Sequence, residues 1–303
     1  MKEFVPNIDE AKRYVHNYGL YSGYSAAYGV TTESLHDSMK YMPANCNKAL
    51  TVAASGDHPL FCSLYGVKQV DTFDISYNAK CIMDIKTAAI KCLNYSKYID
   101  LLKNLCATDN VLNIPNINKI SKTLSTAEWA YMCSMVGYRL FSHTTWRDKI
   151  DKESLLSSHE YKKLQKIVNK PYNFIWTPID DLGVHLTESY DFIHLSNILD
   201  YMNDSVCRFK LVSRLFDHVN VGGRIVSIHL CGNDWEPIVP MKRFKQLIKG
   251  YQDSLNTYTN ADDFLKESMM KSKQELEQMC KVFKNWRYAK ISHEDIVIFE
   301  RIR

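Results

Sequence analysis

The alternation of short β-rich runs with longer helical stretches constrains the fold of this 303-residue chain more than any other feature. Strands that alternate with helices in this way build a mostly parallel sheet that is covered by helices on both faces. We therefore predict an α/β, Rossmann-like fold with a seven-stranded sheet. The predicted strands occupy residues 50–54, 69–74, 174–177, 190–195, 224–230, 287–291 and 296–301.

Turn signals locate the strand connections near the end of the chain. Gly222-Gly223 is expected to introduce the fifth strand, and the four residues 292–295 suit a hairpin between the last two strands. The final strand is therefore predicted to run antiparallel to its neighbour.

Apolar residues at helical spacing predict helices between the strands. Residues 78–93 carry one apolar stripe, and residues 206–216 read the same way. Two longer segments are also mostly helical in pattern, and structureless loops of that length are uncommon in a compact domain. We predict an N-terminal helical lid over residues 1–45 and a Rossmann-like domain over residues 46–303, with helical insertions at about 95–170 and 233–285.

The composition excludes several classes of protein. With 46% hydrophobic and 24% charged residues, the chain has the composition of an ordinary globular protein, and its net charge of +4 is too small to predict nucleic-acid binding. The basic excess lies in residues 241–303, where a solvated face and an anion- or membrane-contacting patch are both open interpretations. No apolar stretch has the length of a membrane helix, and the charged first fifteen residues do not resemble a signal peptide.

The cysteines and histidines are not spaced as metal ligands. Nine cysteines are scattered singly with no C-x-x-C pair, which is typical of reduced thiols in a cytoplasmic protein. No pair of histidines has a spacing such as H-E-x-x-H, so no metal site is predicted.

The turn after the first predicted strand is the sharpest chemical feature. Gly56 lies in this turn, where a glycine allows a ligand to approach the backbone, and Asp74 ends the second strand 18 positions later. An acidic residue at this place can accept hydrogen bonds from the two hydroxyls of a ribose; a tight turn and a helix-capping aspartate are the alternative. The three-glycine fingerprint of dinucleotide binding is absent, and bulky neighbours leave no space for a pyrophosphate. This favours a nucleoside cofactor without phosphates, namely S-adenosylmethionine.

Polar residues follow two later strands. Asp180 and Asp181 come after the third strand, where a carboxylate can meet the amino group of an adenine; a solvent-exposed loop acid is the alternative. Ser196 and Asn197 end the fourth strand, where they can contact a cofactor or cap the following helix. The cofactor interpretation and its alternative are both left open for Asp180 and Asp181 and for Ser196 and Asn197.

Four motifs resemble those of class I S-adenosylmethionine-dependent transferases, in particular the branch that contains the diacylglycerol 3-amino-3-carboxypropyltransferases of betaine-lipid synthesis. The resemblance covers the core, roughly residues 45–93 and 172–230, and not the first 45 residues or the two insertions. The turn Asp57-His58-Pro59 differs from the small-residue turn of that branch. The motifs are Ser55-Gly56-Asp57, Phe73-Asp74-Ile75-Ser76, Met83-Asp84-Ile85-Lys86-Thr87-Ala88-Ala89-Ile90 and Leu195-Ser196-Asn197-Ile198-Leu199-Asp200.

The resemblance implies an enzyme that transfers the 3-amino-3-carboxypropyl group of S-adenosylmethionine to a small-molecule or lipid acceptor. Methyl transfer and a non-catalytic Rossmann-like binding subunit are the alternatives, and the oligomeric state is left open. The expected cofactor contacts are Asp74 and Ile75 near the ribose, Asp180 or Asp181 at the adenine, Ser55, Gly56 and Asp57 at the methionine part, and Ser196 and Asn197 at the end of the fourth strand.

No residue stands out as a catalytic base. His58 lies in the cofactor turn and is a weak candidate, and His194 on the fourth strand suits a buried core position better. Tyr21 and Tyr24 belong to an N-terminal run of tyrosines spaced three or four apart, which suits either an aromatic stripe packed on the core or a lid on the cofactor.

Overall fold

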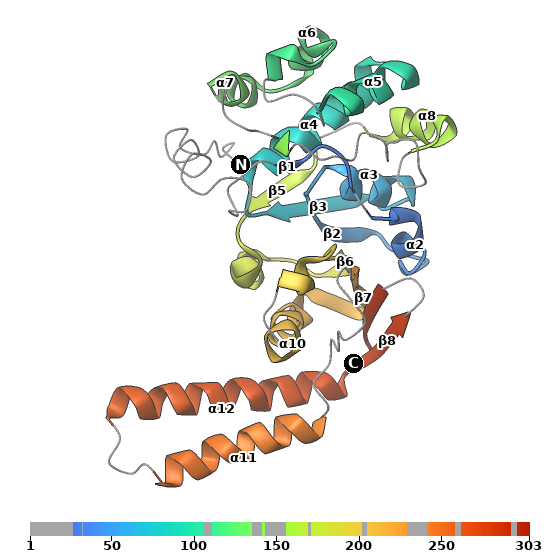
Figure 1. Cartoon of the computed structure of the whole chain (residues 1–303). Helices are drawn as coiled ribbons and strands as arrows, with labels where there is room; N and C mark the ends of the chain where they lie inside the picture. The colour runs from blue at the N-terminus through green and yellow to red at the C-terminus, as the bar shows by residue number, and fades with distance from the viewer. Residues whose placement is uncertain are drawn as a thin grey trace. The chain divides into compact units, whose positions relative to one another are not determined.

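The computed structural model describes residues 27–31, 33–105, 111–134, 141–142, 156–168, 171–201, 205–228, 241–257, 262–291 and 296–303. The chain divides after His185 into two compact units, which are described separately. One seven-stranded sheet is formed in the order β5-β3-β2-β6-β7-β9-β8 (Figure 1). The predicted α/β, Rossmann-like fold with a seven-stranded, mostly parallel sheet is thereby confirmed.

In the first unit, three parallel strands form the order β5-β3-β2. Each contains β-branched or aromatic residues, which favour strands, and each ends within two residues of its predicted end. A second, two-stranded parallel sheet joins β1 (Ala27–Tyr28) to β4 (Phe141–Ser142). The three strands of the main sheet are β2 (Lys48–Val52), β3 (Gln69–Asp74) and β5 (Asn173–Trp176).

The helices of the first unit lie between and around these strands, and the described part of the predicted insertion 95–170 is largely helical. The α-helices are α2 (Leu35–Met39), α3 (Asp57–Leu64), α4 (Tyr77–Cys92), α5 (Tyr95–Leu105), α6 (Ile117–Ile120), α7 (Thr126–Ser134), α8 (Ser158–Ile167) and α9 (Leu182–His185), and the 3-10 helices are η2 (Val111–Asn113), η3 (Ser121–Thr123) and η5 (Ile179–Asp181).

Helix α4 is buried almost all round, although its sequence predicts one apolar stripe. Ile82, Ile85 and Ala89 of that stripe are buried, but so are Asp84 and Lys86. The reason is that α4 contacts β3 and also the helices α5, α6 and α8. Charged residues on this helix must therefore find partners inside the protein.

The second unit contains β6 (Tyr190–His194) parallel to β7 (Val219–Ile228), which pairs with the antiparallel hairpin of β9 (Ile296–Arg301) and β8 (Trp286–Ile291). The predicted antiparallel orientation of the final strand is confirmed. The prediction that Gly222-Gly223 precedes the fifth strand is wrong. The strand begins at Val219, and its register against β6 shifts because Tyr190 pairs with Val219 but Phe192 pairs with Arg224.

Helices of the second unit include α10 (Ser205–Arg214), α11 (Met241–Thr257) and α12 (Asp263–Lys284), with the 3-10 helices η6 (Ile198–Tyr201) and η7 (Phe216–His218). Helices α11 and α12 contact each other along a two-helix hairpin (Figure 1). Among the described residues, no helix has both the length and the apolar character to cross a membrane.

Candidate functional site

The turn between β2 and α3 has a backbone that most residues do not adopt. Ala54 has φ +43° and Gly56 has φ +79°, both in the left-handed region, and the Gly56 N–H donates to the Ala53 carbonyl over 2.7 Å. A Cβ atom at Gly56 would lie 2.7 Å from Cα of Met83 on α4. Gly56 therefore allows both the turn and the close approach of α4. Backbone strain at a non-glycine residue such as Ala54 occurs often at ligand sites.

Asp74 connects the end of β3 to this turn. Its Oδ2 accepts the Ala54 N–H over 2.9 Å, and its Oδ1 accepts the Ser76 N–H over 2.9 Å. Burial raises the pKa of Asp74 to about 6, against the opposing effect of hydrogen bonds from Ser76 and Ala54. The residue as a whole is nevertheless only half-buried. Because a carboxylate has about four lone-pair sites and the backbones of Ser76, Ala54 and Ile75 hydrogen-bond to this one, the carboxylate can accept a further hydrogen bond.

The end of β5 lies beside the end of β3. The Trp176 indole N–H donates to the Ile75 carbonyl over 2.8 Å, and the Thr177 N–H donates to the Asp74 carbonyl over 3.1 Å. Asp180 and Asp181 follow in η5, where both are exposed. The carboxyl ends of β2, β3 and β5 therefore form one continuous edge, which carries Asp74.

Ser55, Asp57 and His58 are buried rather than facing solvent. Asp57 Oδ1 pairs with Lys86 Nζ at 2.6 Å, and its Oδ2 accepts the Ser55 hydroxyl at 2.7 Å and the Thr31 N–H at 2.8 Å. The sequence predicted that Asp57 contacts the methionine part of the cofactor. In the structure its carboxylate is bonded to Lys86, Ser55 and Thr31.

His58 also has a protein partner. Its Nε2 lies 2.9 Å from Glu33 Oε2, and the two side chains are 2% and 4% exposed. Glu33 and Thr31 were not predicted as site residues, and Lys86 belongs to one of the four motifs but was given no role. A signal existed only for Lys86, which interrupts the apolar stripe of α4 four residues after Ile82.

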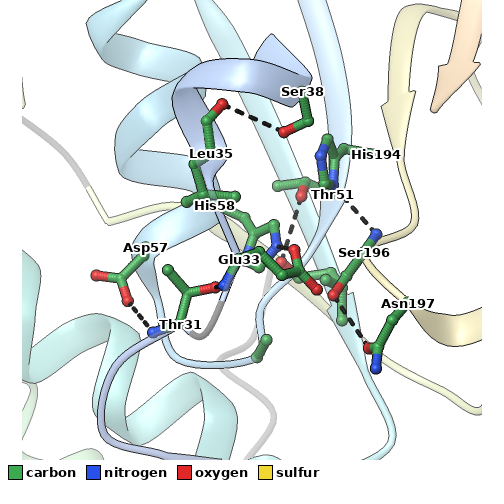
Figure 2. Close-up of polar contacts among 12 residues, drawn as sticks. Thr31, Glu33, Leu35, Ser38, Thr51, Asp57, His58, His194, Ser196 and Asn197 are labelled. Atoms are coloured by element: carbon green, nitrogen blue, oxygen red, sulfur yellow. Dashed lines mark hydrogen bonds and ion pairs between the residues drawn. The ribbon is translucent and has the colours of Figure 1, made fainter. Parts of the chain in front are cut away.

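In the second unit, Ser196 has a left-handed backbone with φ +53° directly after β6. Its N–H donates to His194 Nδ1 at 3.1 Å and its hydroxyl donates to Asn197 Oδ1 at 3.3 Å (Figure 2). Its carbonyl accepts the Ser227 hydroxyl at 2.7 Å. His194 is fully buried, as expected of a core histidine. Ser196 thus repeats, at the end of β6, the non-glycine strain that Ala54 shows after β2.

Two further points concern the tyrosine candidates and metal binding. Tyr21 and Tyr24 lie outside the described residues, whereas Tyr28 of the same run is 49% exposed in β1. Within the described part of the chain, no group of three or more His, Cys, Asp or Glu side chains is arranged to hold a metal ion.

Comparisons with known proteins yield similar structures only. No family model matches the chain, and no curated protein matches it. An rRNA methylase from Streptococcus thermophilus is 11% identical with a TM-score of 0.31, covering 88% of this chain and 94% of its own. The rRNA methyltransferase aviRa from Streptomyces viridochromogenes is 9% identical with a TM-score of 0.38, covering 72% and 82%. TehB from Haemophilus influenzae is 11% identical with a TM-score of 0.34, covering 97% and 67%. Values this low assign this chain neither a family nor a substrate.

Proposed function

We propose that this chain is an enzyme that binds S-adenosylmethionine and transfers one of its alkyl groups to an acceptor. The observation that carries the proposal is Asp74, a partly exposed carboxylate at the end of β3 whose Oδ2 is bonded to the turn after β2. In an open α/β sheet, ligands bind at the carboxyl ends of the strands, and an acidic residue after the second strand receives the ribose hydroxyls.

The sheet order agrees with the proposal. Numbered along the chain, the seven strands lie in the order 3-2-1-4-5-7-6, with the seventh antiparallel. This is the dinucleotide-binding order with one antiparallel strand inserted before the sixth. The closing hairpin is the feature expected from the resemblance to S-adenosylmethionine-dependent transferases.

The residues at the strand ends fit a nucleoside cofactor. The Asp74 carboxylate accepts the backbone N–H groups of Ala54 and Ser76, and the backbone of Ile75 also hydrogen-bonds to it. Because a carboxylate has about four lone-pair sites, it can still accept a hydrogen bond from a ribose hydroxyl. Asp180 and Asp181 are exposed beyond β5 and are proposed to receive the adenine amino group. Ile75 would border the ribose, and Ser196 and Asn197 remain proposed cofactor contacts in the second unit.

The turn after β2 would contact the methionine part through its backbone. Ser55 and Asp57 are occupied by internal hydrogen bonds, so the backbone around Gly56 is the group left to bind that end. S-adenosylmethionine supplies a sulfonium that activates three carbons toward nucleophiles. The chain's own contribution is to orient the acceptor for in-line attack and to exclude water.

For the transferred group we propose 3-amino-3-carboxypropyl, on the strength of the sequence resemblance. The altered turn Asp57-His58-Pro59 adds no support, because Asp57 and His58 are buried against other protein groups. Methyl transfer is the second candidate, and it is equally compatible with the folded core. We propose a small molecule or a lipid as the acceptor.

Calorimetry and product analysis test the proposal. S-adenosylmethionine should bind the purified chain, and Asp74→Ala should weaken binding about tenfold to a few hundredfold, since each charge-assisted hydrogen bond contributes roughly 1.5–3 kcal/mol. Asp37→Ala removes a carboxylate that is 51% exposed on α2 and serves as the matched control. A folded wild-type chain that does not bind S-adenosylmethionine would refute the proposal.

The nucleoside product distinguishes the two transfers. Attack on the γ-carbon of the methionine chain leaves 5′-methylthioadenosine, whereas attack on the methyl carbon leaves S-adenosylhomocysteine. Incubation with S-adenosylmethionine and a cell extract, followed by chromatography against a no-enzyme control, is expected to yield methylthioadenosine. S-adenosylhomocysteine alone would establish methyl transfer, and neither product would favour the binding subunit.

A further inference from the structure

Residues 29–31 and 33–39, here called the strap, pack along α3 directly before the first strand of the main sheet. Leu35 and Met39 of the strap are buried, and Met39 Sδ lies 4.0 Å from Cys62 Sγ on α3. The His36 ring stacks edge-on against Phe61 of the same helix, with centroids 4.9 Å apart. Beyond the first turn of α3, the strap is therefore attached to this helix by ordinary side-chain packing.

At the first turn of α3, the strap is attached by buried polar groups. The Thr31 N–H donates to Asp57 Oδ2, and Glu33 pairs with His58, so both strap contacts reach the first two residues of the helix. The Glu33 N–H donates to Thr31 Oγ1 over 3.2 Å, which fixes the strap backbone between these contacts. Figure 2 shows the strap contacts with Asp57 and His58 together.

The Asp57 carboxylate joins the strap to the turn and to α4. Its Oδ2 accepts both the strap amide and the Ser55 hydroxyl of the turn, while its Oδ1 pairs with Lys86, whose side chain is 0% exposed. Lys86 lies one turn along α4 from Met83, the residue that touches Gly56. The turn after β2 is therefore held from one side by α4 and from the other by the strap.

The polar groups buried between the strap and the first turn of α3 indicate a role beyond simple attachment. Apolar side chains could hold the strap there at a lower desolvation cost. A buried ion pair contributes little net stability, but removal of one partner leaves an uncompensated charge. The groups of the turn thus depend on the docked strap for their full set of hydrogen bonds. When the strap leaves, Asp57 loses a donor and His58 loses its carboxylate.

We propose that the docked strap sets the conformation of the turn at residues 54–57, with Glu33, His58 and Lys86 as positioning residues. Binding of S-adenosylmethionine and docking of the strap then favour each other, because coupling between two equilibria is reciprocal. This second statement rests on the proposed function, whereas the first concerns the ligand-free chain.

Hydrogen exchange and calorimetry on Glu33→Ala test the proposal. In the ligand-free variant, exchange of the amides of residues 54–58 should rise by about tenfold or more, while amides of α5 and α8 in the same unit keep their protection. The dissociation constant for S-adenosylmethionine should rise about five- to a hundredfold. Glu33→Gln, which can still hydrogen-bond to His58, should restore part of both effects, and Asp37→Ala on the exposed side of the strap should change neither.

The outcomes separate the two proposals. A folded Glu33→Ala chain whose turn exchanges as in the wild type would overturn the inference. So would an equal rise of exchange in α5 and α8, since that is a global loss of stability; if Glu33→Ala does not fold, Glu33→Gln is judged by the same criteria. Faster exchange confined to the strap and the turn, with no binding of S-adenosylmethionine by the wild type, would support the strap and refute the proposed function.

Discussion

The ionisation of Asp74 should control binding at the proposed site. Burial raises its pKa from 3.8 to about 6, so the carboxylate gains a proton as the pH falls through 6. A protonated carboxyl accepts hydrogen bonds from ribose hydroxyls less well. We expect the affinity for S-adenosylmethionine to fall by about tenfold per pH unit below 6, measured by calorimetry between pH 7.5 and 5. In Asp74→Asn, the affinity should depend much less on pH. A wild-type affinity that is the same at pH 5 as at pH 7.5 would contradict the prediction.

The same pKa shift has a consequence for stability with a definite sign. The folded chain binds this proton more tightly than the unfolded chain, since the pKa is higher in the folded state. The stabilisation from Asp74 is therefore fully present below about pH 4 and is lost as the pH rises through about 6. An aspartate that costs stability at neutral pH is typical of a functional residue rather than a packing residue.

A comparison of Gly56 with Gly66 distinguishes the effect of a steric clash from the effect of a positive φ angle. Both have positive φ, +79° and +96°, but a Cβ at Gly56 would lie 2.7 Å from Met83 Cα, whereas at Gly66 nothing lies within 4 Å. Gly66→Ala should lower the free energy of unfolding by about 1–2 kcal/mol, and Gly56→Ala by about 2–5 kcal/mol. Urea denaturation measures both, and equal losses would show that α4 can move away from the turn.

At the scale of elements, a buried ion pair connects the insertion to the core. Lys80 of α4 contacts Asp84 at 2.6 Å and also Glu128 of α7, and its side chain is 13% exposed. Burial raises the pKa of Asp84 to about 8, although the charge of Lys80 opposes this shift. Burial opposes ionisation of Glu128 too, but the hydrogen bond from Asp84 and the charge of Lys80 lower the pKa of Glu128 overall. The ion pair that holds α7 is thus Lys80 with Glu128.

Removal of Lys80 should therefore loosen α7 and destabilise the fold. Lys80→Met leaves Glu128 buried without its cation and is expected to lower the free energy of unfolding by about 3–5 kcal/mol, measured by urea denaturation. The control is Lys273→Met on α12, which removes an exposed pair with Glu277 at 3.5 Å and should cost less than about 1 kcal/mol. Similar losses in both variants would mean that water replaces the Lys80 contact.

At the scale of the whole molecule, ligand binding should appear as added stability. A ligand that binds only the folded chain stabilises it by about 2.7 kcal/mol at a hundred times its dissociation constant. S-adenosylmethionine at that concentration should raise the Tm by several degrees in a thermal scan. At the same concentration the rise in Asp74→Ala should be about half as large if binding is tenfold weaker, and close to zero if binding is a few hundredfold weaker. It should persist in Asp37→Ala, and a rise of the wild-type size in Asp74→Ala would remove Asp74 from the site.

The sequence by itself determined the elements and the fold class. The strands 69–74 and 296–301 have the predicted bounds, and Asp74 lies at a strand end, because hydrophobic periodicity and turn residues act over a few neighbouring positions. The antiparallel final hairpin follows from its short connection for the same reason.

Only the tertiary structure decided which side chains at the turn are buried against other protein groups. Asp57 and His58 look like site residues in the sequence, yet they are occupied by Lys86 and Glu33, which lie 29 and 25 positions away. Glu128 lies 48 positions from Lys80 and carries no local signal of that contact. The strap buries one face of α3, and the helices of the insertion bury a second face of α4. Charged groups on these faces must pair because burial of an unpaired charge is costly. Local sequence patterns cannot encode such pairs, because they arise from segments that meet only in the folded chain.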